Sequence, residues 1–368
     1  MTSQSPRRRV GQAPTIYDVA RECGVAPSTV SRAFSRPGRV SAETGERIRA
    51  AAARMGYRAN PPARALSTGR SSMVALVIPD VTNPVYFDIT RGAEDAAAEA
   101  GYTMLLADFR ETGQLERKAI DRALPAVEGL VLGGPRISDS TIRRAAKQRP
   151  TVILNRAVTG LPSVVIDNPR GIRRAAEHLG ELGHEAITYL AGPEASWADG
   201  MRWRALREAG LELDLRVRRL GPYPPTLAGG LAAVDDVLRQ QTTTAVVAYN
   251  DLMAIGLMHG LQRARVPVPR QVSIVGFDNI FGSDFCTPAL TTVAAPLRTL
   301  GAAGVRRLLA QLGGAISWPG RPEMLPVRLV VRASTAQRSR KRSSPARGTT
   351  SVSGSAAQAS GSTAAGSR

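Results

Sequence analysis

Cysteine and long apolar runs are scarce in this 368-residue chain, and each scarcity excludes a class of protein. Cys23 and Cys286 lie in parts of the chain that we assign to different domains, so a disulfide framework is not expected. No apolar run approaches the roughly 18 residues that a membrane-spanning helix needs. The basic start, Arg7 to Arg9, is not followed by the apolar stretch of a secretory signal. We therefore expect a cytoplasmic protein that does not contact a membrane.

Residues that carry catalysis are also few. His178, His184 and His259 lack the spacing and the further ligand that a metal site needs. No G-x-S-x-G elbow and no P-loop occurs, and the run Gly133-Gly134-Pro135 predicts a turn instead of a phosphate cradle. We expect neither an enzyme nor a metal or organic cofactor.

Positive charge, in contrast, is abundant: the formal net charge is +19. Residues 1–72 hold 13 Lys and Arg against 4 Asp and Glu, and residues 337–368 hold 6 against none, whereas the middle is nearly balanced at 30 against 26. A basic head on a balanced body is typical of proteins that neutralise nucleic-acid phosphates. It predicts DNA binding that weakens steeply with salt.

Residues 15–59 predict a small helical domain. Apolar residues recur at helical spacing from Ile16 to Cys23, and Gly24 then supplies a turn that a residue with a Cβ would resist. A second helix directs Val30 and Ala33 toward a core, which is the pattern of a helix-turn-helix. A third helix follows an N-cap serine at position 41 and ends at a glycine at position 56.

The second helix leaves a set of mostly polar residues facing outward. Hydroxyl groups can reach base edges or phosphates, and the fork of Arg32 fits the O6/N7 edge of guanine, so we expect Arg32 to read a G·C pair. The alternative is that these residues are only the solvated face of a helical bundle. The candidate DNA contacts on this helix are Pro27, Ser28, Thr29, Ser31, Arg32 and Ser35.

Residues 60–72 predict a short hinge helix and linker. Asn60 is a good N-cap, Pro61 fits the first helical position, and Gly69 can end the helix. A helix of two turns is marginal in water, so it should form only when DNA and a partner chain hold it. Leu66 would then insert between base steps in the minor groove. An ordinary linker with one stray leucine is the alternative.

From Met73 the pattern changes to short apolar runs that alternate with helical stretches. Such runs indicate parallel sheets covered on both faces, and the length of the region, with a midpoint near Asp167, indicates two doubly wound α/β lobes. The candidate strands are residues 74–79, 103–107, 129–132, 151–154, 163–166, 186–191, 245–249 and 273–277.

Polar residues follow several of these strands, at the ends where ligands bind in open α/β sheets. Carboxylates and amides can bind hydroxyl pairs while aromatic rings cover the apolar face of a sugar, so the pattern favours a polyhydroxyl ligand. Helix capping is the alternative for the Asp-Asn pairs. The candidate effector contacts are Tyr86, Phe87, Asn155, Arg156, Arg202, Asn250 and Asp278, with Asp80, Asn83, Trp197, Asp251 and Asn279 beside them in the motifs.

Residues 15–335 resemble the lactose-repressor (LacI/GalR) family of transcriptional regulators. Several motifs occur in the order that the family shows, namely TIYDVARECGVAPSTVSRAFSRPGRVS, RMGYRANPPARALSTGRS, DNPRGIRRAAEHLGELGH, NDLMAIGLMHGL, VPVPRQVSIVGFDN and PALTTV. The resemblance implies that Tyr17, Ser28, Thr29 and Arg32 contact double-stranded DNA. It also implies that the segment from Ala63 to Leu66 forms a minor-groove hinge helix, and that the operator is a near-palindrome.

For the core at residues 73–335, the resemblance implies two subdomains of the periplasmic-binding-protein type. The chain would cross near residue 167, return to the first lobe near Pro296 and reach the second again near Leu325. Arg202, Asn250 and Asp278 would contact a small-molecule effector, a sugar or sugar derivative. The expected protein is a repressor controlled by that effector; a sugar-binding transport protein is the alternative that the core alone would support.

The two ends of the chain lack a globular pattern. Residues 1–14 predict a flexible basic start. Residues 336–368, rich in Ser, Ala, Gly and Arg, predict a disordered basic tail that adds non-specific affinity for DNA. No apolar heptad repeat follows Arg332, so a homodimer is expected in preference to a tetramer.

Overall fold

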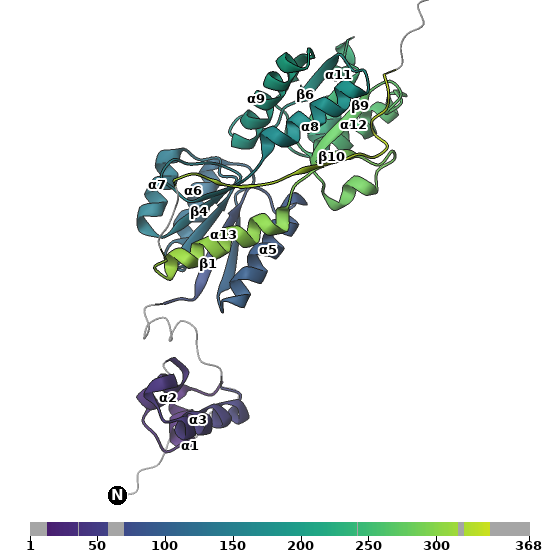
Figure 1. Ribbon diagram of the computed structural model, residues 1–368. Coiled ribbons are helices and arrows are strands. Elements are labelled where there is room, and N and C mark those ends of the chain that lie inside the picture. Colours follow the sequence, from purple (N-terminus) through teal and green to yellow (C-terminus); the bar gives the residue numbers. More distant parts are fainter. Residues whose placement is uncertain (1–12, 36, 58–69, 241, 316–319, 339–368) are drawn as a thin grey trace, which may run out of the picture. The chain divides into compact units, whose positions relative to one another are not determined.

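The computed structural model describes residues 13–35, 37–57, 70–240, 242–315 and 320–338 (Figure 1). These residues form a helical head and a core of two α/β lobes. Within them, no helix is long and apolar enough to cross a membrane.

The head has three α-helices, α1 (Ile16–Glu22), α2 (Pro27–Ser35) and α3 (Ala42–Met55), with a 3-10 turn η1 (Pro37–Arg39) before the last. Asp18 accepts a hydrogen bond from the backbone N–H of Thr15 at 2.8 Å and so caps α1. Gly24 has φ 63°, the left-handed conformation that the turn requires. Small and branched side chains fill the core between the helices: Val19, Ala20, Val30, Ala33, Ile48 and Ala52.

The first lobe contains a six-stranded parallel sheet in the order β11-β5-β4-β3-β1-β2. Its four central strands are apolar and buried by helices on both faces, as the sequence predicts, whereas the two edge strands are partly exposed. The strands are β1 (Met73–Ile78), β2 (Thr103–Asp108), β3 (Gly129–Gly133), β4 (Thr151–Leu154), β5 (Ser163–Ile166) and β11 (Glu323–Leu325).

Two pairs of helices cover this sheet. One face packs against α5 (Val85–Glu99) and α13 (Leu297–Leu312), and the other packs against α6 (Gly113–Ala123) and α7 (Asp139–Gln148) (Figure 1). Helices α5 and α13 cross in close contact because each contributes a glycine. A Cβ at Gly92 would collide with the carbonyl oxygen of Arg298, and one at Gly301 with that of Ile89.

The second lobe repeats the arrangement with the strand order β12-β10-β9-β8-β6-β7. Its pairs are parallel except that β12 runs antiparallel to β10, a difference from the all-parallel expectation at one edge. The strands are β6 (Ala186–Leu190), β7 (Arg216–Leu220), β8 (Ala245–Ala248), β9 (Ser273–Asp278), β10 (Thr291–Ala294) and β12 (Arg328–Val330). The helical elements are α8 (Asn168–Glu181), α9 (Trp197–Glu212), α10 (Leu227–Ala232), α11 (Val234–Arg239), α12 (Asp251–Arg263) and η2 (Phe281–Asp284).

The chain passes between the lobes three times: between β5 and α8, between β10 and α13, and between β11 and β12. Two of these passages are hydrogen-bonded to each other, because the N–H of Asp167 donates to the carbonyl of Leu325 at 3.0 Å. The last described residues of the core are also held by hydrogen bonds. The N–H of Arg338 donates to the carbonyl of Leu182, and that of Ala336 to the hydroxyl of Ser273.

Candidate functional site

Helix α2 presents one buried face and one accessible face. Val30 and Ala33 are buried in the head, whereas Ser28 and Arg32 are exposed. Tyr17 on α1 is 66% exposed. Pro27, Thr29 and Ser31 are partly exposed, and Ser35 ends the helix.

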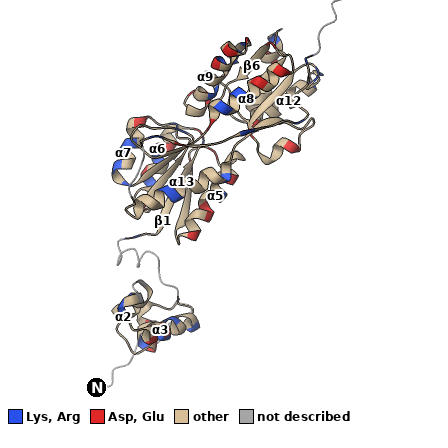
Figure 2. Cartoon of the chain, viewed as in Figure 1, with Lys and Arg blue, Asp and Glu red and all other residues tan. Residues whose placement is uncertain are grey.

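Basic residues lie on both α2 and α3 (Figure 2). The acidic side chains of α1 are paired with other arginines: Asp18 lies 3.7 Å from Arg21, and Glu22 lies 3.7 Å from Arg54 on α3. Within residues 13–35 and 37–57, Arg32 takes part in no ion pair. The guanidinium of Arg32 is therefore available to an external anion or base edge. The expected hinge contacts, Ala63 and Leu66, lie outside the described residues.

A second group of predicted residues lies where strands of the two lobes end. Asn155 follows β4, Asn250 follows β8 and Asp278 ends β9, and these carboxyl ends belong to parallel strands of the two sheets. We call this region the lobe junction and define it by Asn155, Tyr86, Arg202, Asn250 and Asp278. It is where open α/β sheets bind their ligands.

Arg202, on α9, is the most connected side chain of the lobe junction and is only 4% exposed. Its Nε donates to the side-chain oxygen of Asn168 at 2.8 Å, and another nitrogen donates to the carbonyl of Tyr249. A third contact reaches Asp278 Oδ1 at 3.4 Å. The guanidinium also lies 3.5 Å from the ring centroid of Phe277. Arg202 thus ties α8, α9, β8 and β9 together at one point.

Asp278 is held in an unusual state. Its φ of 109° is rare for a residue with a side chain, and its carboxyl group is buried. Burial raises the pKa of Asp278 to about 7; the charge of Arg202 opposes this rise and that of Asp251 adds to it. Near neutral pH, Asp278 can therefore either accept a hydrogen bond as a carboxylate or donate one as an acid.

Asn250 performs the helix-capping role that the sequence left open, whereas Asp251 bonds to later elements of the second lobe. The side-chain oxygen of Asn250 accepts from the N–H of Met253 at 2.9 Å, and its amide donates to the carbonyl of Pro225 at 3.1 Å. Asp251 accepts from the N–H of Ile280 at 2.9 Å, from Ser283 at 2.7 Å and from Thr292 at 2.5 Å. These bonds fix the loops that follow β8 and β9.

On the first lobe, Tyr86 is buried at the start of α5, and burial raises its pKa well above the ordinary value. Charged groups of both lobes also affect this pKa: Arg136 of the first lobe lowers it, and Asp278 of the second lobe raises it. Asp80 and Asn83, just before it, bond only locally, to Thr82 and to the N–H of Val85.

Arg136 is a lobe-junction residue that sequence reasoning missed. Its guanidinium pairs with Glu111 at 2.8 Å and donates to the carbonyl of Gly134 at 2.8 Å. Glu116 holds the loop between β3 and α7, because its Oε2 accepts hydrogen bonds from the backbone N–H groups of Arg136 and Ile137 at 2.7 and 3.1 Å. The signal in the sequence was weaker than for Asn155, since Arg136 lies three residues past the end of β3, whereas Asn155 directly follows β4.

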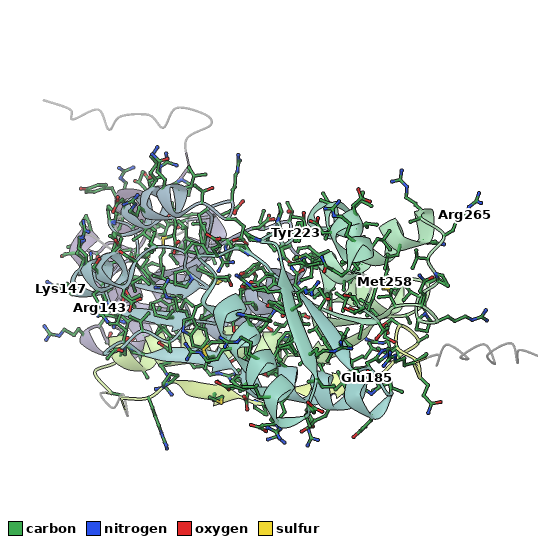
Figure 3. The ribbon with its side chains drawn as sticks, turned by 90° about the horizontal axis from the view of Figure 1, so that it is seen from above. Arg143, Lys147, Glu185, Tyr223, Met258 and Arg265 are labelled. Atoms are coloured by element: carbon green, nitrogen blue, oxygen red, sulfur yellow. The ribbon has the colours of Figure 1, made fainter. Side chains whose placement is uncertain are left out.

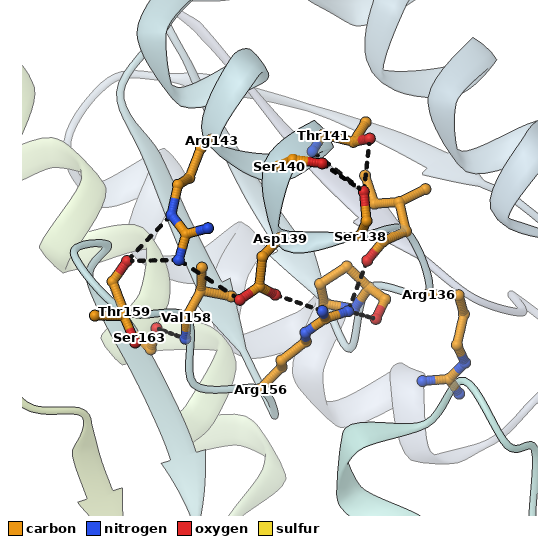
Figure 4. A network of polar contacts seen from close by, with 12 residues as sticks. Arg136, Ser138, Asp139, Ser140, Thr141, Arg143, Arg156, Val158, Thr159 and Ser163 are labelled. Carbon is orange, nitrogen blue, oxygen red and sulfur yellow. Dashed lines mark hydrogen bonds and ion pairs between the residues drawn. The ribbon is translucent and has the colours of Figure 1, made fainter.

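Arg156 takes part in a polar network of the first lobe, with Asp139 among its partners (Figure 4). It donates to the carbonyls of Pro135 and Ile137 at 2.9 and 2.8 Å and to Asp139 at 2.5 Å. Its neighbour Asn155 has φ 55°, and the buried side-chain oxygen of Asn155 accepts no hydrogen bond from the described residues. The two neighbours therefore differ: the guanidinium of Arg156 is hydrogen-bonded within the first lobe, whereas the side-chain oxygen of Asn155 can still accept a hydrogen bond.

Two of the predicted aromatic residues, Phe87 and Trp197, also differ in their surroundings. Phe87, 50% exposed, stacks on Phe281 of the second lobe with ring centroids 6.2 Å apart, and Phe281 contacts Phe285. Phe87 thus makes a contact between the lobes. Trp197 is the first residue of α9, five residues before Arg202, and is partly exposed.

Comparisons with known proteins find matches to both the helical head and the two-lobed core. Residues 15–60 match the family described as bacterial regulatory proteins, lacI family, and residues 176–335 match the periplasmic binding protein-like domain. The HTH-type transcriptional repressor CytR of Escherichia coli (strain K12) is 34% identical over 332 residues, which are 88% of this chain and 96% of that protein. The regulator DegA of Bacillus subtilis (strain 168) is 32% identical and covers 88% of this chain and 98% of its own length.

Solved structures show the same architecture. The Lac repressor dimer bound to operator and the anti-inducer ONPF matches with a TM-score of 0.80 and 26% identity, over 88% of this chain and all of that one. The transcriptional regulator CelR in complex with cellobiose matches with a TM-score of 0.65 and 28% identity, over 87% of this chain and 99% of that one.

Proposed function

Because this chain belongs to the LacI family of bacterial regulatory proteins, we propose that it is a homodimeric transcriptional repressor whose affinity for a palindromic operator is controlled by a small molecule. The observation that supports DNA recognition most directly is α2, a helix with Ser28 and Arg32 exposed on the face opposite its buried side. The relatives named above are transcriptional regulators, and we propose no catalytic role.

In this proposal α2 lies in the major groove, and Arg32 donates both arms of its guanidinium to a guanine. The remaining contacts on bases and phosphates come from Tyr17, Pro27, Ser28, Thr29, Ser31 and Ser35. Ala63 and Leu66 belong to the hinge that opens the minor groove at the centre of the operator.

The effector that we propose is a sugar or sugar derivative bound at the lobe junction. Supporting this, the CelR structure holds cellobiose, and two related regulators from Enterococcus hold ribose. Arg202 and Asp278 offer a donor and an acceptor side by side, and Asn155 offers a buried acceptor. Tyr86 faces them from α5.

Three other predicted residues act indirectly in this proposal. Asn250 caps α12, Arg156 holds the loop between β3 and α7, and Phe87 contacts the second lobe. We propose Asn250 and Arg156 as positioning residues, and Arg136 as an additional contact on the side of the first lobe.

The two-lobed core explains how binding of the effector could be coupled to binding of the operator. A ligand that binds one lobe arrangement more tightly than another shifts the equilibrium toward it, and the hinge segments follow the first lobe, to which they are covalently joined. Release of DNA by the ligand would make it an inducer; tighter binding would make it a corepressor.

The proposal is tested by selecting fragments of the source genome with the purified full-length protein at moderate salt and sequencing those retained. A palindrome of one or two helical turns is the expected result, and the neighbouring genes then indicate which sugars to add. Recovery of fragments with no shared sequence would overturn the proposal and leave a non-specific basic head.

A further inference from the structure

A cavity of about 450 Å³ opens at the edge of the first lobe where its strands begin. It lies between the C-terminal parts of α7 and α13, beside Thr151 at the start of β4, whereas Asn155 and the lobe junction lie at the opposite ends of the strands. No contact described above reaches this cavity, and its size is within the range of small-molecule sites.

The cavity is lined by three cations and no carboxylate. Lys147 comes from α7, Arg149 from the loop before β4 and Arg307 from α13. One neighbouring acid compensates one of them, because Glu323 pairs with Arg307 at 2.7 Å. Arg149 donates to the neutral carbonyl of Val127 at 3.0 Å, which leaves its charge uncompensated. The cavity therefore presents two exposed cations, Lys147 and Arg149, that pair with no carboxylate of the described residues.

Gln311 on α13 supplies a second, independent sign of a missing ligand. Its side-chain oxygen is buried and accepts no hydrogen bond from any described residue. Buried polar groups normally have partners, and those that do not call for an explanation. Because an amide can present either its oxygen or its NH₂ group after a flip, a hydroxyl or an anion oxygen in the cavity would satisfy it.

We propose that this cavity binds a small phosphate monoester, as a second ligand site separate from the lobe junction. A phosphate monoester carries between one and a half and two negative charges near neutral pH, which matches the two uncompensated cations. Guanidinium groups bind phosphate oxygens through paired N–H donors, and lysine adds a point charge. Leu161 and Ala310 offer an apolar wall to the carbon part of the ligand.

Lysine is rare enough in this chain to make the test specific. The sequence contains three lysines, Lys118, Lys147 and Lys341. Lys147 lies on α7 at the outer side of the first lobe (Figure 3), and Lys118 is exposed on α6, outside the cavity lining. Reductive ¹³C-methylation keeps the lysine charge and gives each side chain its own NMR signal. Lys118 then serves as a control within the same molecule.

The full-length dimer is titrated at low ionic strength with glucose 6-phosphate, with inorganic phosphate and with glucose. We expect both phosphates to shift the Lys147 signal to saturation, glucose to shift nothing, and Lys118 to stay in place. Gln311→Glu places a carboxylate in the cavity at nearly constant volume and should weaken phosphate binding at least tenfold. The matched change Gln114→Glu, on exposed α6, should leave the affinity unchanged.

Two results would overturn the proposal. Equal, non-saturating shifts of Lys147 and Lys118 would mean general screening of surface charge. Saturable binding that Gln311→Glu does not weaken would mean that phosphate binds outside the cavity. Neither result depends on operator binding or on the sugar effector, so failure here is distinct from failure of the proposed function.

Discussion

At the scale of single residues, Asp278 determines how the lobe junction responds to pH. Its pKa, raised by burial to about 7, means that its carboxylate form becomes dominant only above neutrality. If an effector hydroxyl donates to this carboxylate, affinity should rise roughly tenfold between pH 6 and pH 8. Isothermal titration across this range tests the prediction, and Asp278→Asn should remove both the dependence and the response of operator binding. A response that survives Asp278→Asn would exclude the residue from the site.

Arg202 should matter for stability as well as for binding. Loss of one partner of a buried ion pair leaves an uncompensated charge, so at pH 8, where Asp278 is mostly ionised, Arg202→Met should lower the free energy of unfolding by about 3–5 kcal/mol. The double variant Arg202→Met/Asp278→Asn should recover part of that loss, because the second change removes the orphaned charge. Urea unfolding of the three variants measures the coupling. Strictly additive losses would show that the pair itself contributes nothing.

Glu116 makes the stability of the first lobe depend on pH. Burial raises its pKa from the ordinary 4.5 to about 7, so the folded state binds the proton more tightly than the unfolded state. Stability is therefore lost as pH rises from about 4.5 through 7, by about 3 kcal/mol in total for this group. Glu116→Gln should abolish that contribution, and the difference in unfolding free energy between variant and wild type should change between pH 5 and pH 8. Parallel curves would contradict the assignment.

At the scale of the element, α2 carries the specificity of the head. Arg32→Ala should cost about 1–3 kcal/mol of operator binding and relax the preference at a single base pair. Arg54→Ala removes the same charge from α3, where the arginine pairs with Glu22, and should weaken binding little and without change in sequence preference. Fluorescence anisotropy on a set of singly substituted operators separates the two. Equal effects of both variants would reduce Arg32 to a phosphate contact.

The hinge segment is tested by one substitution. Leu66→Ala should weaken operator binding while leaving affinity for non-specific DNA and for the effector nearly unchanged, because an apolar wedge acts only where it kinks the duplex. Matched binding curves on operator and random DNA measure the ratio. Unaltered discrimination would leave residues 60–72 as a plain linker.

Elements also show where prediction from sequence succeeds and where it fails. Buried strands such as β3 and β9 are predicted because both faces are covered and the run is apolar throughout. The edge strand β7, Arg216–Leu220, is not predicted, because three of its five residues are arginine and only its pairing with β6 makes it a strand. Likewise, that Arg202 and Asp278 meet depends on how α9 and β9 pack, whereas the capping by Asn250 depends only on its neighbours in sequence.

At the scale of the whole molecule, different interactions determine how the head and the lobes bind their ligands. The head relies on charge and on exposed polar groups, so its affinity should be sensitive to salt. The lobes rely on a continuous apolar interior, and their junction holds its few charges in buried, paired positions. Salt should therefore weaken operator binding far more than effector binding.

The three passages between the lobes have a consequence for synthesis on the ribosome. The first lobe lacks α13 and β11 until residue 325 has been made, although its other strands are complete by Ile166. At about 5–20 residues per second, this delay of about 160 residues lasts roughly ten seconds or more. During that time, the sheet face that α13 later covers stays open. A shortened chain that ends before α13 should therefore not yield a stable first lobe.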